Sequence, residues 1–416
     1  MLDSKGERQL AYVVKIDKIT PIEGYDRVEL AHVGGWTIVV GKGEFEAGDP
    51  AIYFEIDSKL PEVKPFTDME FLAKKHYKIK TQKMCKSISQ GLLMSAANFG
   101  WTVCKKNNEN LTDIIVGIVD TNNDSHWVYH WADDESRFLT AALGVTYAET
   151  SDNLRKAASA DKYKRMAQRH GKLFSHQPYR WLMKRDWGKK LLFIFYGKKK
   201  DTRSWPAWVK KTDEERIQNM PWILKDKEPW IATEKIDGTS TTFTIKRKPF
   251  GRYDFFICSR NVVFDKPDKK CYYETNVYTE MAEKYNIKEV LVSLLKAYPN
   301  ADWITIQGET YGPGIQKRDY HRDTHNFRAF NLIMSSTGRW NTISMKKELE
   351  ENFGIPCVPI VDSAYILPDS VEEVLAYAFG ESVIDNDMRE GIVFRSLNGE
   401  KSFKAVSNEY LIKYHG

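Results

Sequence analysis

Short apolar runs separated by polar turns dominate residues 8–100, and this pattern is typical of β-strands. Gly34-Gly35 lies between two of the runs and predicts the two-residue turn of a hairpin. Five short strands joined by tight turns favour a small barrel such as an OB-fold. The predicted strands are residues 11–19, 28–33, 36–40, 51–56 and 91–94.

The middle of the chain has weaker periodicity. Residues 101–150 contain two polar stretches, 107–110 and 121–125, that we predict to be loops. Residues 151–204 read as a basic connector that contains short helical pieces.

Strands return in the last 200 residues, with helices between them. Thr212 with Glu215, and Ser370 with Glu373, have the spacing of a capping box, which predicts helices over 212–220 and 371–379. A third helix is expected at 277–297, and Asn398-Gly399 predicts a hairpin turn. The whole chain is therefore expected to be of the α+β class. Its later strands are predicted at 230–235, 240–246, 254–259, 303–307, 327–333, 391–396 and 401–406.

Composition bounds the class of protein. The 416 residues, 42% of them hydrophobic, can build two or three domains, which we place at 1–150, 151–204 and 205–416. No apolar run approaches the ~18 residues of a membrane span, and the first residues lack an apolar signal. Five widely spaced cysteines without a Cys-x-x-Cys pair indicate reduced thiols, so we expect a cytoplasmic protein without a disulfide or zinc framework.

Positive charge is concentrated in one segment. Residues 151–225 hold 20 Lys and Arg against 7 Asp and Glu, a net +13, so the rest of the chain has a net charge of −8. Aromatic residues are interleaved with these cations, and such a mixture can neutralise phosphates and stack on bases. A solvated linker with locally packed aromatics is an equally good interpretation.

Lys235-Ile236-Asp237-Gly238 is the most informative motif. A lysine at the end of an apolar run becomes a nucleophile when burial or a nearby cation lowers its pKa. The glycine would let a phosphate approach the backbone. Taken alone, such a short motif is far more often a surface strand that ends in a turn.

Further motifs follow Lys235 in a fixed order. They are Ser259-Arg260-Asn261, Gly308-Glu309, the aromatic strand 327–331, Glu390-Gly391 and a final strand that holds Lys404. In this order the set resembles the signature motifs of the covalent nucleotidyltransferases, which are the polynucleotide ligases and RNA capping enzymes. Residues 89–94, 143–145, 211–219 and 308–316 look like the RNA ligases of the Deinococcus and Naegleria type.

The resemblance implies an OB-fold barrel followed by an ATP-grasp-like nucleotidyltransferase domain. It implies an ATP-dependent RNA ligase that seals nicks with a 3′-OH ribonucleotide and a 5′-phosphate in a duplex. Lys235 would form lysyl-AMP, and AMP would then activate the 5′-phosphate for attack by the 3′-OH. A monomer without a membrane partner, engaged in RNA repair, is expected.

The resemblance also implies a role for each site residue. Lys235 is the nucleophile, and Lys404 meets the charge that develops on the α-phosphate. Mg²⁺ or Mn²⁺ is expected to be held, through water, by Asp237, Glu309 and Glu390. Glu309 could instead hold the ribose hydroxyls. Phe330 would stack on adenine. The full ATP site is expected to comprise Glu234, Asp237, Gly238, Arg260, Asn261, Glu309, Phe330, Glu390 and Lys404, with Asp237, Glu309 and Glu390 as the acids near the metal.

The last motif departs from the family pattern. Relatives often have Lys-x-Lys, whereas this chain has Ser402-Phe403-Lys404 with an additional Lys401. Lys401 and Lys404 are three positions apart on a strand, so they should point to opposite faces. We therefore expect Lys404, rather than Lys401, to contact phosphate.

Three other functions remain open on the sequence. A DNA ligase would differ in the sugar it requires at the 3′-OH end. A capping guanylyltransferase would use GTP, although those enzymes place the OB domain last. A nucleic-acid-binding relative without catalytic activity would form no covalent AMP. A basic run over residues 74–86 could add nucleic-acid contacts in the barrel or be a soluble loop.

Overall fold

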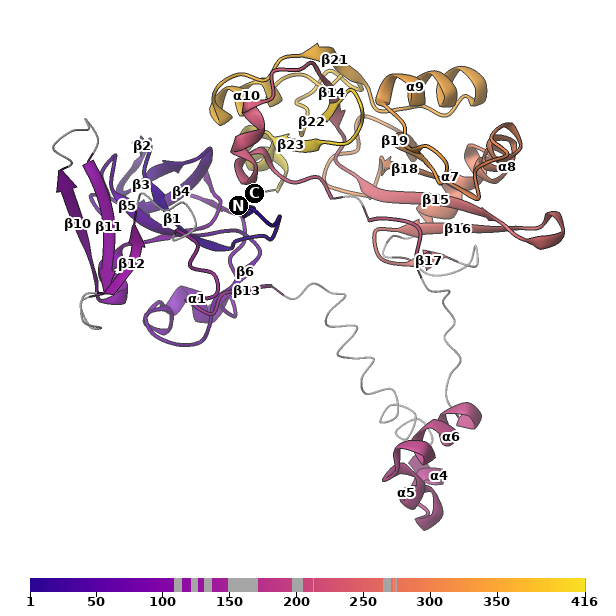
Figure 1. Ribbon diagram of the computed structural model, residues 1–416, viewed down its shortest axis with the longest axis horizontal. Helices are drawn as coiled ribbons and strands as arrows, with labels where there is room; N and C mark the ends of the chain where they lie inside the picture. Colours follow the sequence, from indigo (N-terminus) through magenta and orange to yellow (C-terminus); the bar gives the residue numbers. More distant parts are fainter. Residues whose placement is uncertain are drawn as a thin grey trace.

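A computed structural model describes residues 1–107, 114–120, 126–130, 137–148, 171–196, 205–211, 213–264, 271, 273 and 275–415. An N-terminal unit of β-strands lies beside a larger C-terminal unit of sheets and helices (Figure 1). Both chain ends lie near the junction of the two units. No helix among the described residues is long and apolar enough to span a bilayer.

The N-terminal unit packs two three-stranded sheets around shared apolar side chains. Gly34 and Gly35 form the predicted turn, with φ angles of 51° and 81°. The single strand predicted over 11–19 is wrong, because Ile16 and Asp17 belong to no strand and separate two strands of different sheets. The Asp17 carboxylate accepts the Gly34 N–H at 2.6 Å. The sheets contain β1 (Ala11–Lys15), β5 (Pro50–Phe54) and β9 (Leu92–Met94), and β2 (Lys18–Ile22), β3 (Tyr25–Val33) and β4 (Trp36–Gly41).

Residues 101–150 contain a third sheet, although the sequence predicted little regular structure there. The strands β10 (Trp101–Asn107), β11 (Ile114–Asp120) and β12 (His126–His130) pair antiparallel. The apolar runs in β10 and β12 are short and end at polar residues, so they gave little alternation, whereas the longer run Ile114–Val119 of β11 was not predicted to be a strand. The loops predicted at 107–110 and 121–125 lie outside the described residues, except that Asn107 ends β10.

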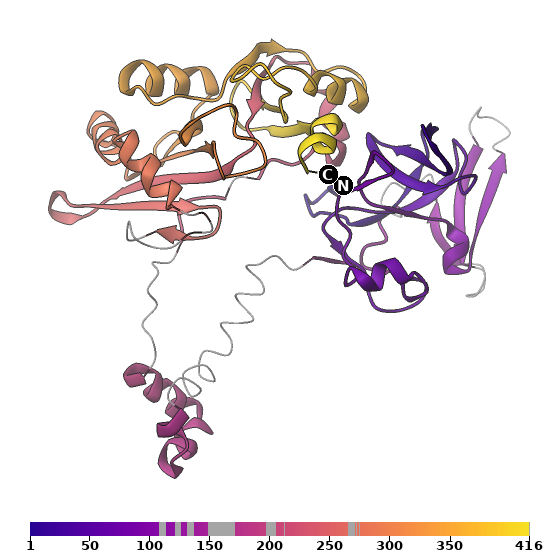
Figure 2. The same cartoon turned by 180° about the vertical axis from the view of Figure 1, so that it is seen from behind.

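The predicted helical pieces of the connector are confirmed. They are α4 (Gly171–Phe174), α5 (Gln177–Met183) and α6 (Asp186–Tyr196), which pack together around Phe174 and Leu192. This small helical unit lies apart from both sheet-bearing units (Figure 2).

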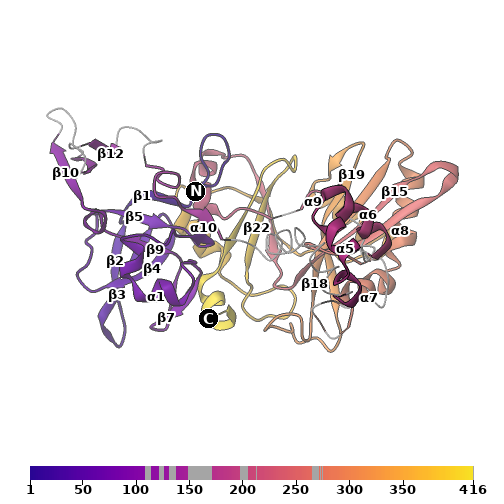
Figure 3. The ribbon, with the colours of Figure 1, turned by 90° about the horizontal axis from the view of Figure 1, so that it is seen from below.

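The C-terminal unit contains two antiparallel sheets, visible next to each other in Figure 3. A four-stranded sheet has the order β21-β14-β22-β23 and a six-stranded sheet the order β17-β16-β15-β18-β19-β20. The strands are β14 (Trp230–Lys235), β15 (Thr239–Arg247), β16 (Tyr253–Ser259), β17 (Val263–Phe264), β18 (Trp303–Tyr311), β19 (Asn326–Met334), β20 (Gly338–Arg339), β21 (Ile360–Tyr365), β22 (Gly391–Ser396) and β23 (Ser402–Val406).

Helices cover these sheets at three places. The helix predicted over 277–297 is divided into α7 (Val277–Lys284) and α8 (Ile287–Ala297), because Asn286 between them has φ 48°. The cap predicted at Ser370 is confirmed: its side chain accepts the Glu373 N–H at the start of α10 (Val371–Ala378). Two shorter helices are α9 (Thr342–Lys346) and α11 (Asn408–Tyr410).

The helix predicted over 212–220 is wrong, and its first residue, Thr212, lies outside the described residues. The chain is extended there because the Glu215 carbonyl accepts the Lys404 N–H at 2.7 Å, a contact a helix would forbid. Only short 3₁₀ turns follow, at Ile217–Asn219 and Pro221–Lys225.

The barrel and the C-terminal unit contact each other directly. Ile88 of the barrel packs with Val406 and Leu411. The Gly35 turn lies against α10, where the Gln218 amide donates to the Gly35 carbonyl at 3.4 Å. These contacts place the barrel beside the strand that carries Lys404.

Candidate active site

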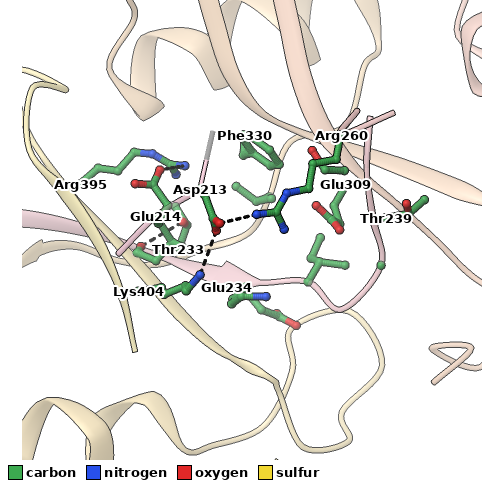
Figure 4. A pocket seen from close by; sticks show the side chains of 16 residues that line it. Asp213, Glu214, Thr233, Glu234, Thr239, Arg260, Glu309, Phe330, Arg395 and Lys404 are labelled. Atoms are coloured by element: carbon green, nitrogen blue, oxygen red, sulfur yellow. Dashed lines mark hydrogen bonds and ion pairs between the residues drawn. The ribbon is translucent and has the colours of Figure 1, made fainter. Parts of the chain in front are cut away.

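A cavity of about 360 Å³ opens between the two sheets of the C-terminal unit and lies within the size range of small-molecule sites. Strands of both sheets supply its walls, and Figure 4 shows their side chains converging. Seven of the predicted site residues line it: Glu234, Lys235, Gly238, Arg260, Glu309, Phe330 and Lys404.

Lys235 ends β14 and forms an ion pair with Glu390, whose carboxylate lies 2.6 Å from the Lys235 amine. Burial by itself lowers the pKa of Lys235, but the carboxylates of Glu390, Glu309 and Asp237 outweigh burial and raise that pKa above its usual value. The lysine is therefore held as an ammonium, and a cation that neutralised these acids would favour the free amine.

Glu309 on β18 is one of these acids. Burial raises the pKa of Glu309 to about 8, and the negative charges of Glu390 and Asp237 contribute to this rise against the opposing effect of Lys235. No group of three or more His, Cys, Asp or Glu within the described part of the chain is arranged to hold a metal ion directly. The surplus of negative charge nevertheless fits a hydrated divalent cation, which keeps several of its waters.

Asp237 does not line the cavity. The Tyr410 hydroxyl donates to its carboxylate at 2.9 Å, and its backbone N–H donates to the Tyr320 hydroxyl at 2.7 Å. Gly238 follows it, and a Cβ there would lie 2.4 Å from the Thr310 carbonyl oxygen. Glycine is therefore required for close packing against β18, whatever approaches from the cavity.

Glu234 is almost fully buried and precedes Lys235 in β14. Its carboxylate accepts the Ser382 hydroxyl at 2.5 Å and the Val383 N–H at 2.8 Å. Burial raises the pKa of Glu234 although both hydrogen bonds favour the ionised form. The carboxylate thus joins β14 to the loop after α10.

Phe330 forms part of an apolar wall at one end of the cavity. It packs at the edge of a small cluster that contains Ile236 and Val358, and the Arg395 guanidinium lies 5.8 Å from its ring centroid. The ring is half-buried and faces the cavity. An adenine base could stack here, whereas a ring packed wholly in the core could not accept one.

Two further cations, Lys404 and Arg260, line the cavity and share one carboxylate. Burial lowers the pKa of Lys404 despite its partner Asp213, whose carboxylate lies 3.1 Å from the Lys404 amine. Arg260 pairs with the other oxygen of the same carboxylate. Lys401 lies elsewhere, paired with Asp226 at 2.6 Å, so the two lysines point apart as strand alternation predicts.

Asn261 lies just outside this cavity. Its side chain accepts from Lys211 at 2.6 Å and lines a second cavity of about 590 Å³. That cavity adjoins the first through Asp213, Arg260 and Lys404, and its far wall is formed by barrel residues, including Arg8 and Tyr147.

Sequence reasoning missed three charged residues that line the site: Asp213, Glu214 and Arg395. Glu214 contacts Arg395 at 3.3 Å and also accepts from Ser402. For Asp213 and Glu214, the sequence signal was the run 211–219, which drew attention through resemblance but was assigned to a helix. For Arg395, the signal was a charged residue at the end of the apolar run Ile392–Phe394 of β22.

Comparison with known proteins agrees with this arrangement. Residues 228–415 match the RNA ligase family, and residues 10–96 match a family of OB-fold domains. Residues 228–415 form an RNA ligase domain. The predicted α+β architecture, with an OB-fold barrel before a nucleotidyltransferase domain, is confirmed for this chain.

Solved structures of the Naegleria gruberi RNA ligase are similar along the whole chain. A variant of that enzyme with AMP and Mn and a variant with ATP and Mn each have a TM-score of 0.60. The same ligase with PPi has a TM-score of 0.59. In all three, identity is 26%, and the match covers 98% of this chain and 99% of the other. No curated protein matches the chain.

Proposed function

We propose that the protein is an ATP-dependent RNA ligase that seals 3′-OH/5′-phosphate nicks through lysyl-AMP. The observation that carries the proposal is the place of Lys235. Its amine lies in a cavity between a cluster of carboxylates and the cationic pair Lys404 and Arg260. A nucleotide can lie across that cavity with its base on the Phe330 side and its phosphates on the cationic side.

Three transfers follow from this arrangement. The free amine of Lys235 attacks the α-phosphorus of ATP, a P–N bond forms, and the P–O bond to pyrophosphate breaks. A 5′-phosphate oxygen of the RNA then attacks the same phosphorus and releases the lysine. The 3′-OH finally attacks the 5′-phosphorus, loses its proton and expels AMP. Positioning and charge neutralisation are the main requirements of phosphoryl transfer.

The side chains divide these tasks. Glu390 orients the Lys235 amine through their ion pair. Lys404 and Arg260 neutralise phosphate oxygens, and Phe330 stacks on adenine. We assign the neighbouring Asn261 to the phosphate side through its contact with Lys211. Glu234 holds the wall beside the lysine, and its bonds to the Ser382 loop fix that wall.

A divalent cation fits the acidic cluster of Asp237, Glu309 and Glu390. Mg²⁺ or Mn²⁺ held there through water would supply positive charge that lowers the pKa of Lys235 and neutralises phosphate. The Naegleria relatives solved with ATP or AMP also contain Mn.

The barrel and the basic helical unit would bind the nucleic acid. We propose domain boundaries after residues 150 and 204. The OB domain ends at the first boundary, and the connector with the basic helical unit lies between the two. The exposed cations of that helical unit and those of the barrel would neutralise phosphates of a nicked duplex, and one chain would suffice for sealing. Such binding should weaken with salt.

Covalent labelling tests the lysine directly. Wild-type protein incubated with α-labelled ATP and Mg²⁺ should retain label through denaturing electrophoresis, and Lys235→Ala should retain none. Lys401→Ala is a matched control because Lys401 pairs with Asp226 outside the cavity, and it should label normally. A labelled Lys235→Ala protein would contradict the mechanism.

Sealing assays distinguish the related activities. A nicked duplex with ribose at the 3′-OH end should be sealed faster than one with deoxyribose, because a 2′-hydroxyl distinguishes RNA from DNA. Equal rates would favour a DNA ligase. Labelling by GTP in preference to ATP would favour a capping enzyme, and an absence of any labelling would favour a binding protein without catalytic activity.

A further inference from the structure

One carboxylate joins the two cations at the phosphate end of the cavity. Asp213 Oδ1 accepts from the Lys404 amine at 3.1 Å, and Asp213 Oδ2 accepts from Arg260 Nη2. Figure 4 shows Asp213 between the two side chains, with dashed lines to each. We refer to this arrangement as the Asp213 bridge.

The bridge gives the cations the same kind of partner that a phosphate would give them. Carboxylate and phosphate oxygens both accept charged hydrogen bonds from lysine and arginine. Burial alone raises the pKa of Asp213, but Lys404 and Arg260 outweigh this effect and lower the pKa below its usual value. The carboxylate is therefore ionised at neutral pH, and it occupies acceptor positions that a phosphate group would need.

The backbone around Asp213 is anchored, while its side chain is not enclosed. On one side, the Gln307 amide donates to the Lys210 carbonyl at 3.0 Å. On the other, the Glu215 carbonyl accepts the Lys404 N–H at 2.7 Å. The Asp213 side chain itself is 57% exposed, so it can rotate towards solvent without displacing this segment.

We propose that Asp213 is an internal counter-anion that holds Lys404 and Arg260 together in the nucleotide-free enzyme and yields its place to a phosphate group. The inference rests on the proposed function, since it takes these two cations as phosphate contacts. The bridge keeps both cations aligned before ATP or an RNA end arrives. It also imposes competition on small phosphate anions, including the pyrophosphate that lysine adenylylation releases.

Binding of inorganic pyrophosphate to the full chain, measured by calorimetry without metal, tests the bridge. Asp213→Asn removes the competing charge and leaves both cations, so pyrophosphate should bind about fivefold more tightly, as expected for the loss of a partly exposed ion pair. Asp226→Asn is the matched control: it breaks the Asp226–Lys401 pair outside the cavity and should leave the affinity unchanged.

The alternative is that Asp213 positions the cations without competing for their ligand. Unchanged or weaker pyrophosphate binding by Asp213→Asn would then be seen, and either result overturns the proposal. If Asp213→Asn is not folded, as judged from its melting curve, Asp213→Ser provides the same comparison.

Failure of the bridge and failure of the proposed function give different results. Covalent labelling of wild-type protein by ATP reports on the function and does not depend on the Asp213 variants. An unlabelled wild type with tighter pyrophosphate binding by Asp213→Asn would refute the ligase proposal and leave the counter-anion intact. A labelled wild type with no gain in affinity would refute the counter-anion alone.

Discussion

If Lys235 is the nucleophile, as we propose, its contact with Glu390 determines how the adenylylation rate should depend on pH. The amine must lose a proton before it can attack. Among the carboxylates that raise the pKa of Lys235, Glu390 has the largest effect. Glu390→Gln removes that attraction, so the pKa of Lys235 should fall. The rise of the adenylylation rate with pH should therefore move to lower pH, even where the maximal rate is reduced.

Initial rates of label incorporation across a pH series measure this shift. Glu409→Gln is a suitable control, because Glu409 is an exposed acid that accepts from the Ser407 hydroxyl and should leave the profile in place. An unmoved profile in Glu390→Gln would show that the ion pair does not control the protonation of Lys235.

For single residues, the sequence predicted which side chains line the cavity better than it predicted which of them contact one another. Seven of the ten predicted residues line the cavity, because the order of motifs fixes which strand ends meet. The bridge formed by Asp213 could not be predicted, because it joins residues 191 positions apart whose pairing depends on the fold. From the sequence, burial was expected to lower the pKa of Lys235. In the structure that pKa is raised, because the carboxylates of Glu390, Glu309 and Asp237 lie nearby and outweigh burial.

The hairpin of β22 and β23 positions both Glu390 and Lys404, and its two strands are closely packed at Gly391. Gly391 lies opposite Lys235 in the strand register, and a Cβ at Gly391 would lie 2.1 Å from the Ala405 carbonyl oxygen. Gly391→Ala must push the two strands apart, so we expect a loss of about 1–3 kcal/mol of stability, the usual cost of overpacking. Adenylylation should fall as well, because Glu390 and Lys404, to which we assign roles in the reaction, would be displaced.

Thermal unfolding and ATP labelling of the same preparations check this prediction. Gly399→Ala, in the turn of the same hairpin, is the control, because the nearest atom to its Cβ is 3.6 Å away. Its φ of 73° should cost about 1–2 kcal/mol, yet labelling should persist. Normal labelling by a folded Gly391→Ala protein would contradict the argument.

Elements were predictable where local pattern and tertiary contacts agree. β14 and β22 have the predicted bounds, because each contains an apolar stretch, Trp230–Ala232 and Ile392–Phe394, that is followed by polar residues. The capping box at Ser370 starts a helix, whereas the similar pattern at Thr212 does not. The difference is tertiary, since the segment after Thr212 pairs with β23, and a short-range signal cannot report such pairing.

The distribution of charge over the whole molecule predicts how RNA binding responds to salt. The helical unit exposes Arg180, Lys184, Arg185 and Lys190, and Arg185 lies 3.7 Å from the ring centroid of Trp181. If Lys184 and Arg185 contact phosphates of a nicked RNA duplex, replacing both with Gln should weaken binding. The slope of log affinity against log salt should fall by about two.

Salt titrations of binding to a nicked RNA duplex test this expectation. Lys227→Gln with Lys248→Gln removes the same charge from the C-terminal unit, where each lysine already has an acidic partner. That control should bind with the wild-type slope. An unchanged slope in the Lys184 and Arg185 variant would identify the helical unit as a linker or as a site for another partner.

Substitutions at the Gly35 turn could change how the barrel packs against the C-terminal unit. A methyl group at Gly35 would lie 2.5 Å from Val371 at the start of α10, so even alanine would act as a wedge between the two units. Neither Gly35 nor Val371 lines the cavity that contains Lys235. Larger side chains at this position would provide a graded series, in which self-labelling and end-joining could be uncoupled by geometry alone.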